Sequence, residues 1–190
     1  RLAGPVTDPA GQRLKWSRRL RKGDAVLVQR LLRPEPEVDV SYRILSKDAW
    51  LVAVDKGPGA PVHPSRSFRT RTILTHLRAE LGESELSPAH RIDRETSGVL
   101  VFGRGSAAVA GLARQFAAGQ VAKEYLAVVR GRVEPDRISL DAALQRDPDF
   151  PVRCRMRVAA TGGLAALTEV EVLARGADRS LVRARPRTGR

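Results

Sequence analysis

Apolar positions in the first two thirds of the chain follow two different spacings. Residues 50–54 form a short apolar run, which is typical of a buried strand. Apolar side chains then recur at helical spacing over residues 73–81, and Gly82 is placed to end the predicted helix. Residues 99–102 and 125–129 predict two further strands. Between them, Ser106 could cap a second helix that Gly119 ends.

The last third of the chain alternates apolar and charged residues, which predicts strands with one buried side and one solvent-facing side. Arginines occupy every second position at 153–157 and again at 183–187, while Glu169 and Glu171 alternate with apolar residues on a third segment. These arginine rows could face the phosphates of a nucleic acid. Alternatively, they could pair across neighbouring strands with Glu169 and Glu171, and the pattern leaves both readings open.

Helices that interrupt antiparallel-looking strands predict an α+β fold. The stretch at 34–39, Pro-Glu-Pro-Glu-Val-Asp, is the best candidate for a linker. We therefore divide the chain into a small N-terminal module with its linker, residues 1–38, and a larger domain, residues 39–190.

Charge narrows the choice of partner. The chain has 34 Lys and Arg against 21 Asp and Glu, a formal net charge of +13. Residues 1–35 carry nine basic and three acidic side chains, so the N-terminal end supplies much of the excess. A balance this basic predicts a polyanionic partner, with nucleic acid as the first expectation. No apolar run is long enough to cross a membrane, so we expect no membrane partner.

Metal and cofactor chemistry finds little support in the sequence. The three histidines do not stand at a metal-ligand spacing, and the single cysteine, Cys154, rules out both a CxxC motif and an internal disulfide. No glycine-rich nucleotide loop is complete. We therefore predict no metal site and no cofactor.

The densest group of chemically active side chains lies at residues 90–98, His-Arg-Ile-Asp-Arg-Glu-Thr-Ser-Gly. Asp93 is flanked by Arg91 and Arg94, and nearby cations favour the charged form of a carboxylate. An ionised and positioned aspartate can act as a nucleophile or as a base. From these residues alone, a charged loop without a chemical role remains open.

Residues 90–98 resemble the HRLDxxTSG signature of RluA-type pseudouridine synthases, with Ile92 in the place of leucine. Residues 54–64 resemble the family's V-N-K-P-x-G…V-H-P loop, with Asp55 where the family has asparagine and Gly57 where it has proline. Residues 123–131 are similar to its K-x-Y-x-A-x-V-x-G strand, and residues 188–190 match the start of its TGRxHQ[IL]R segment. The four motifs stand in the family's order over roughly residues 42–190.

This resemblance implies an enzyme that isomerises uridine in RNA to pseudouridine without a cofactor. It implies that Asp93 acts as nucleophile or base at the ribose, that Tyr125 packs against the target base, and that Arg190 pairs with Asp93. A uridine within folded RNA has to be flipped out of its stack. Arg91 would fill the vacated position or hold a phosphate, and His90 would contact RNA or brace the loop.

The implied fold is a mixed, largely antiparallel sheet with flanking helices around an active-site cleft. The family's last strands and helix would follow Arg190, so we expect the chain to lack the C-terminal part of the catalytic domain. Residues 1–33 resemble the later half of a small RNA-binding module that often precedes these synthases. Ribosomal RNA is the expected substrate and transfer RNA its rival. We further expect a cytoplasmic monomer.

Two other function classes remain open. A non-catalytic RNA-binding protein could keep the same scaffold, although binding alone requires neither Asp93 nor Tyr125. A hydrolase could use Asp93 with His90 or His63 as its acid–base partner. A single carboxylate among arginines, in place of two acids facing each other, counts against a glycosidase.

Overall fold

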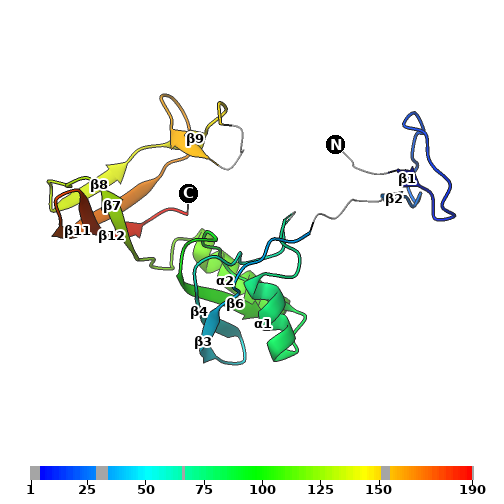
Figure 1. The fold of residues 1–190 in the computed structure, drawn as a ribbon, viewed down its shortest axis with the longest axis horizontal. Coiled ribbons are helices and arrows are strands. Elements are labelled where there is room, and N and C mark those ends of the chain that lie inside the picture. Colours follow the sequence, from blue (N-terminus) through cyan, green and yellow to red (C-terminus); the bar gives the residue numbers. More distant parts are fainter. Residues whose placement is uncertain (1–4, 29–33, 66, 151–154, 190) are drawn as a thin grey trace. The chain divides into compact units, whose positions relative to one another are not determined.

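The computed structural model describes residues 5–28, 34–65, 67–150 and 155–189. Its contacts divide the chain into two compact units, the first ending at Arg104 and the second beginning at Gly105 (Figure 1). In the described residues, both units combine a helix with antiparallel strands, so the predicted α+β class is confirmed. The boundary that we predict at residue 38 lies inside the first unit and stays a prediction.

The N-terminal module, residues 5–28, is held together by little more than backbone contacts. Its strands β1 (Val6–Thr7) and β2 (Leu27–Val28) pair antiparallel. No side chain of these residues is buried. The turns between the two strands depend on two carboxylates, because the amide of Gln12 donates to Asp8 and that of Arg21 donates to Asp24.

The main sheet of the first unit has the strand order β3-β4-β6-β5, and all its neighbours are antiparallel. The strands are β3 (Tyr42–Lys47), β4 (Leu51–Lys56), β5 (Leu86–Pro88) and β6 (Gly98–Arg104). The register sets Val52 opposite Phe102 and Val54 opposite Leu100. All four side chains are fully buried, and each contributes about 1.5–3 kcal/mol through the apolar area it removes from water.

The helix of this unit, α1 (Ile73–Leu81), is the one that the sequence predicts, with the same bounds. Thr72 caps its first turn by accepting a hydrogen bond from the amide of Thr75 at 3.2 Å. Gly82 ends it in the left-handed conformation, at φ 68°, which other residues adopt only with strain. Ile73, Leu74 and Leu77 face the core and complete its apolar packing.

The second unit begins with α2 (Gly105–Ala117). Ser106 is the second residue of this helix, so the prediction that it caps the helix is wrong. Its four-stranded sheet has the order β7-β12-β11-β8 and is antiparallel throughout. A separate pair, β9 and β10, lies between β8 and β11 in the sequence. These strands are β7 (Tyr125–Arg130), β8 (Arg137–Asp141), β9 (Leu144–Arg146), β10 (Met156–Val158), β11 (Leu167–Arg175) and β12 (Arg179–Pro186).

The arginine rows of the last third pair with acidic side chains. Arg183 on β12 lies 2.9 Å from Glu171, and Arg187, which directly follows β12, lies 2.7 Å from Glu169. Arg185 lies 2.9 Å from Glu124. In the register of β11 and β12, Arg183 lies directly opposite Glu171. Both predicted acids, Glu169 and Glu171, are paired with arginines of residues 183–187, so cross-strand pairing is the correct alternative for this row.

The β10 row is paired as well. Arg157 lies 2.9 Å from Asp149, and Arg155 lies 3.6 Å from Asp147. The Arg155 guanidinium also stacks over the Phe150 ring, at 4.8 Å from its centroid. The third arginine of this row, Arg153, lies outside the described residues.

Candidate active site

The predicted nucleophile, Asp93, lies in the loop that joins β5 to β6. Its side chain is exposed, as is that of the neighbouring Arg91. The loop makes a turn here, because the amide of Thr96 donates to the Asp93 carbonyl at 3.1 Å. Ile92 points the other way and packs against the apolar core. The side chains of Ile92 and Asp93 therefore point in opposite directions: Ile92 anchors the loop to the core, and the Asp93 carboxylate faces solvent.

A buried lysine, Lys56, donates hydrogen bonds to the backbone of the same loop. Lys56, the last residue of β4, is fully buried. Its ammonium donates to the carbonyls of Gly57 at 2.9 Å, Arg94 at 2.7 Å and Thr96 at 2.8 Å. Burial lowers the pKa of Lys56 below its ordinary value, and the negative charge of Glu95 partly opposes this shift. Two of the three carbonyls, those of Arg94 and Thr96, belong to the turn that begins at Asp93.

Gly57 stands where the family pattern of residues 54–64 has proline, and the structure shows what glycine allows at this position. The Gly57 amide donates to the Ser41 carbonyl at 2.9 Å, a hydrogen bond that the proline of the family motif cannot make. A Cβ atom at position 57 would lie 2.1 Å from the Ser41 hydroxyl oxygen, so any larger residue would collide with it. The substitution of glycine for proline therefore allows residue 41 to pack directly against the loop.

The two arginines beside Asp93 do not form an ion pair with it. Arg94 instead pairs with Glu95, at 2.7 Å between Nε and Oε1. Its guanidinium also lies over the Phe68 ring, 5.9 Å from the centroid. Within the described residues, the structure records no hydrogen bond or ion pair for the Asp93 carboxylate, which leaves its oxygens accessible for chemistry.

His90 braces the loop through a ring nitrogen. Its Nε2 accepts a hydrogen bond from the amide of Val101 on β6 at 3.2 Å. The preceding residue, Ala89, donates its own amide to the Val101 carbonyl at 2.8 Å. Together these contacts fasten the start of the Asp93 loop to the central strand. Bracing of the loop is thus observed for His90, while its contact with RNA stays a prediction.

The remaining predicted site residues lie elsewhere. Tyr125 is the first residue of β7 in the second unit, half-buried and opposite Ala184 of β12. Arg190, predicted to pair with Asp93, lies outside the described residues. The structure therefore brings His90, Arg91 and Asp93 together in one loop, and it adds Lys56, which the sequence reasoning missed.

The described residues contain neither a cluster of metal ligands nor a membrane-spanning helix. No group of three or more His, Cys, Asp or Glu side chains is placed to hold a metal ion in this part of the chain. None of the described helices has the length and apolar content to cross a membrane.

Comparisons with known proteins identify relatives of this chain. The family model described as RNA pseudouridylate synthase matches residues 50–190. An uncharacterised RNA pseudouridine synthase of Synechocystis is 31% identical over 156 residues, which cover 82% of this chain and 53% of that protein. The ribosomal large subunit pseudouridine synthase D of Neisseria meningitidis is 34% identical over 161 residues, covering 83% of this chain and 41% of that protein.

A solved structure agrees with the fold. Human RNA pseudouridylate synthase domain containing 1 superposes with a TM-score of 0.66 and 25% identity, covering 82% of this chain and 63% of that one. The chain spans about half the length of the curated relatives it matches. With a family match that includes the Asp93 loop, β7 and the end of the chain, the protein belongs to the RNA pseudouridylate synthases, in the RluA-type branch that the sequence motifs indicate.

Proposed function

We propose that this protein isomerises specific uridines to pseudouridine in structured RNA. The bond between uracil and ribose breaks, the base rotates, and a new bond forms between ribose and carbon-5 of the base, so that no redox partner is needed. One observation carries the proposal, namely an exposed Asp93 carboxylate without a partner among the described residues, on a turn whose backbone the buried Lys56 fixes.

This geometry suits a carboxylate that acts on a substrate. A nucleophile or base has to be held in place while its oxygens stay accessible. The Lys56 ammonium and the packed side chain of Ile92 supply the first condition, and the exposed position of Asp93 supplies the second. We propose that Asp93 attacks, or removes a proton from, the ribose of the target uridine.

The other predicted residues keep their roles as proposals. Tyr125 would stack against the target base, and Arg190 would pair with Asp93 in the active state. Arg91, exposed two residues before Asp93, would fill the stack that the flipped uridine leaves or hold a phosphate of the RNA. His90, which braces the loop, would add an RNA contact.

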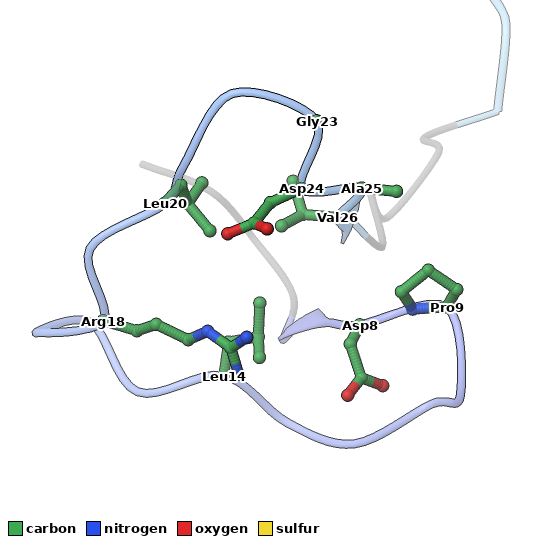
Figure 2. Close-up of a pocket in the computed structure, with 9 residues that line it drawn as sticks. All are labelled: Asp8, Pro9, Leu14, Arg18, Leu20, Gly23, Asp24, Ala25 and Val26. Carbon is green, nitrogen blue, oxygen red and sulfur yellow. The ribbon is translucent and has the colours of Figure 1, made fainter.

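The N-terminal module supports RNA as the partner. Residues 5–28 carry six basic side chains, Arg13, Lys15, Arg18, Arg19, Arg21 and Lys22. None of them forms an ion pair within the described chain, unlike the arginines of β10 and β12. Figure 2 shows the chain from Asp8 to Val26 curving around a shallow pocket of about 340 Å³, into which the Arg18 side chain reaches.

An aromatic side chain lies within this basic segment. Trp16 is 78% exposed; it directly follows Lys15 and lies two residues before Arg18. Cations that bind phosphates, together with an aromatic ring on which a base can stack, match the chemistry of unpaired nucleotides. We favour ribosomal RNA as the substrate, with transfer RNA as the rival, and we keep a cytoplasmic monomer as the expected state of the protein.

Asp93→Asn provides the direct test. We expect the wild-type protein to form pseudouridine in bulk bacterial RNA, mapped by carbodiimide-dependent stops of reverse transcription. The variant should retain RNA binding and lose at least about 10³-fold in rate, because an amide is neither a nucleophile nor a base. Asp178→Asn is the matched control, since Asp178 is exposed in a turn and pairs only with its neighbour Arg179, and it should keep wild-type activity.

The possible outcomes separate the function classes. If the wild type and Asp93→Asn both bind RNA and neither forms pseudouridine, the non-catalytic RNA-binding alternative is favoured. Release of free uracil or a cleaved strand that depends on Asp93 would instead favour a hydrolase. Equal activity of Asp93→Asn and the wild type would contradict the role of Asp93.

A further inference from the structure

The turn that carries Asp93 also carries a cation that could pair with it. Arg94 follows Asp93 directly, and Glu95 comes next. The Arg94 Nε donates to Glu95 Oε1 at 2.7 Å, and among the described residues no ion pair joins Arg94 to Asp93. An arginine side chain is long, and its guanidinium can donate to both oxygens of a carboxylate. Without Glu95, the carboxylate nearest to Arg94 along the chain would therefore be that of Asp93.

The backbone and the ring contact of Arg94 do not depend on Glu95. The Arg94 carbonyl accepts hydrogen bonds from the Lys56 ammonium at 2.7 Å and from the Gly59 amide at 2.9 Å. Its guanidinium lies 5.9 Å from the centroid of the Phe68 ring, and Phe68 is 8% exposed. A change at Glu95 should therefore redirect the guanidinium and leave the shape of the turn as it is.

Glu95 balances positive charge at this turn. Burial lowers the pKa of Lys56, and the negative charge of Glu95 partly opposes that shift. The side chains of Arg94 and Glu95 are 50% and 70% exposed, so their ion pair contributes little to the stability of the fold. What the pair determines is which carboxylate the Arg94 guanidinium contacts.

From these observations, and on the basis of the proposed function, we infer that Glu95 is a positioning residue that keeps the Arg94 guanidinium off the Asp93 carboxylate. A nucleophile or base needs a free lone pair on oxygen, and a guanidinium that donates to both oxygens would occupy them. An unpaired Arg94 would compete for these oxygens with the ribose of the target uridine and with Arg190, the partner we propose for Asp93.

Glu95→Gln tests this role, because it removes the charge and keeps the size of the side chain. An exposed ion pair forms only part of the time, so Arg94 should block part of the Asp93 population and lower kcat about two- to sixfold. KM should not rise, since the variant gains net positive charge toward a polyanionic RNA.

Glu134→Gln is the matched control. The Glu134 carboxylate forms a similarly exposed ion pair with Arg132 in the second unit, at 3.3 Å. This variant therefore changes the net charge by the same amount and breaks the same kind of pair in the other unit of the chain. Its kcat should stay at the wild-type value.

A second substitution separates positioning from a structural effect. Arg94→Met removes the guanidinium, and by itself it should leave kcat near the wild-type value. Combined with Glu95→Gln, it should restore the kcat that Glu95→Gln loses. If Glu95 acted through Lys56 or through the stability of the turn, removal of Arg94 would not restore activity.

Labelling of carboxylates supplies a readout that does not depend on activity. A water-soluble carbodiimide with an amine modifies accessible carboxylates, and peptide mass spectrometry locates the products. Asp93 should be labelled about two- to sixfold more slowly in Glu95→Gln than in the wild type, and at the wild-type rate in the double variant. Asp178, whose side chain is 79% exposed, serves as the internal reference in every sample.

Three results would overturn the inference. The first is equal kcat of Glu95→Gln and the wild type. The second is a loss of activity that Arg94→Met fails to restore, that Glu134→Gln shares, or that Arg94→Met alone produces. The third is equal labelling of Asp93 in Glu95→Gln and the wild type. If the wild type forms no pseudouridine, the proposed function fails, and the labelling alone still decides whether Glu95 keeps Arg94 off Asp93.

Discussion

Lys56 shows how one buried charge can position a loop through contacts with its backbone alone. Its ammonium is held by three carbonyls, and among the described residues no carboxylate forms an ion pair with it, although the charge of Glu95 partly opposes the effect of burial on its pKa. A buried ion is costly unless its hydrogen bonds are complete. The arrangement is therefore stable only when the turn at residues 93–96 has the observed shape, so that the lysine selects one conformation of the Asp93 loop.

Replacing Lys56 by methionine should destabilise the protein by about 2 kcal/mol. Methionine fills a similar volume and removes the cost of burying a charge, but the carbonyls of Gly57 and Thr96 lose the donor they have here. Arg94 keeps a second donor, the Gly59 amide at 2.9 Å. Urea denaturation measures the change, and Lys47→Met, at an exposed residue of β3, should stay within about 0.5 kcal/mol of the wild type. An equal effect of both variants would contradict this role of Lys56.

At the scale of elements, short segments are fixed by side chains that cap or pair them. Thr72 and Gly82 set the two ends of α1, and the ion pair of Arg183 with Glu171 joins two residues that lie directly opposite each other on β12 and β11. The linker, residues 34–39, is also fixed by a side chain, because the Glu35 carboxylate accepts hydrogen bonds from three consecutive amides of the loop before α1, those of Arg69, Thr70 and Arg71.

The linker contact should depend on pH in a defined window. Because the pKa of Glu35 falls from 4.5 to about 2 on folding, its contribution to stability is fully present above pH 4.5 and is lost as the pH falls toward 2. The difference in unfolding free energy between the wild type and Glu35→Ala should thus be constant from pH 5 to 8 and shrink below pH 4.5. Urea denaturation across this range measures it, and a difference that grew on acidification would contradict the assignment.

At the scale of the whole molecule, the basic charge has two different environments. The described arginines of the two rows, residues 155–157 and 183–187, are paired with Asp147, Asp149, Glu124, Glu169 or Glu171. In residues 5–28, the two acidic side chains instead accept from backbone amides. Net charge alone does not reveal this difference, although only the unpaired cations are free to replace the counterions of a nucleic acid.

Salt dependence of RNA binding should distinguish the two environments. Lys15→Gln combined with Arg18→Gln removes two unpaired cations, so the slope of log K against log[salt] should fall by up to about 2. Arg155→Gln combined with Arg157→Gln removes the same charge from paired positions, and it should change the slope far less. Filter binding at 50–200 mM salt is a suitable measurement, and equal slopes for the two double variants would contradict the assignment.

The sequence predicted those parts of the fold that local chemistry decides. Helical spacing followed by Gly82 located α1 to the residue, because the cap and the apolar face are both local signals. The alternation of β11 and β12 predicted strands and offered cross-strand pairing as one of two readings. The sequence also placed Asp93 in an exposed loop before β6, although it did not reveal that Arg94 pairs with Glu95.

Lys56 was missed although a signal was present. Val52, Val54 and Lys56 alternate along β4, so the buried side of the strand ends on the lysine. Charged residues are rarely buried, and the sequence alone does not show that three carbonyls converge there. Glu35 was missed for a similar reason, since its partners lie 34 to 36 positions further along the chain.

By itself, the sequence determined the family, the class of fold, the helix α1 and the identity of the candidate nucleophile, because each depends on residue types at short spacing. The tertiary structure decided which arginines are neutralised, what holds the Asp93 loop and where the linker is attached. These features arise from groups distant in sequence that meet only after the chain folds. Their energies depend on burial and hydrogen-bond geometry, which no local pattern encodes.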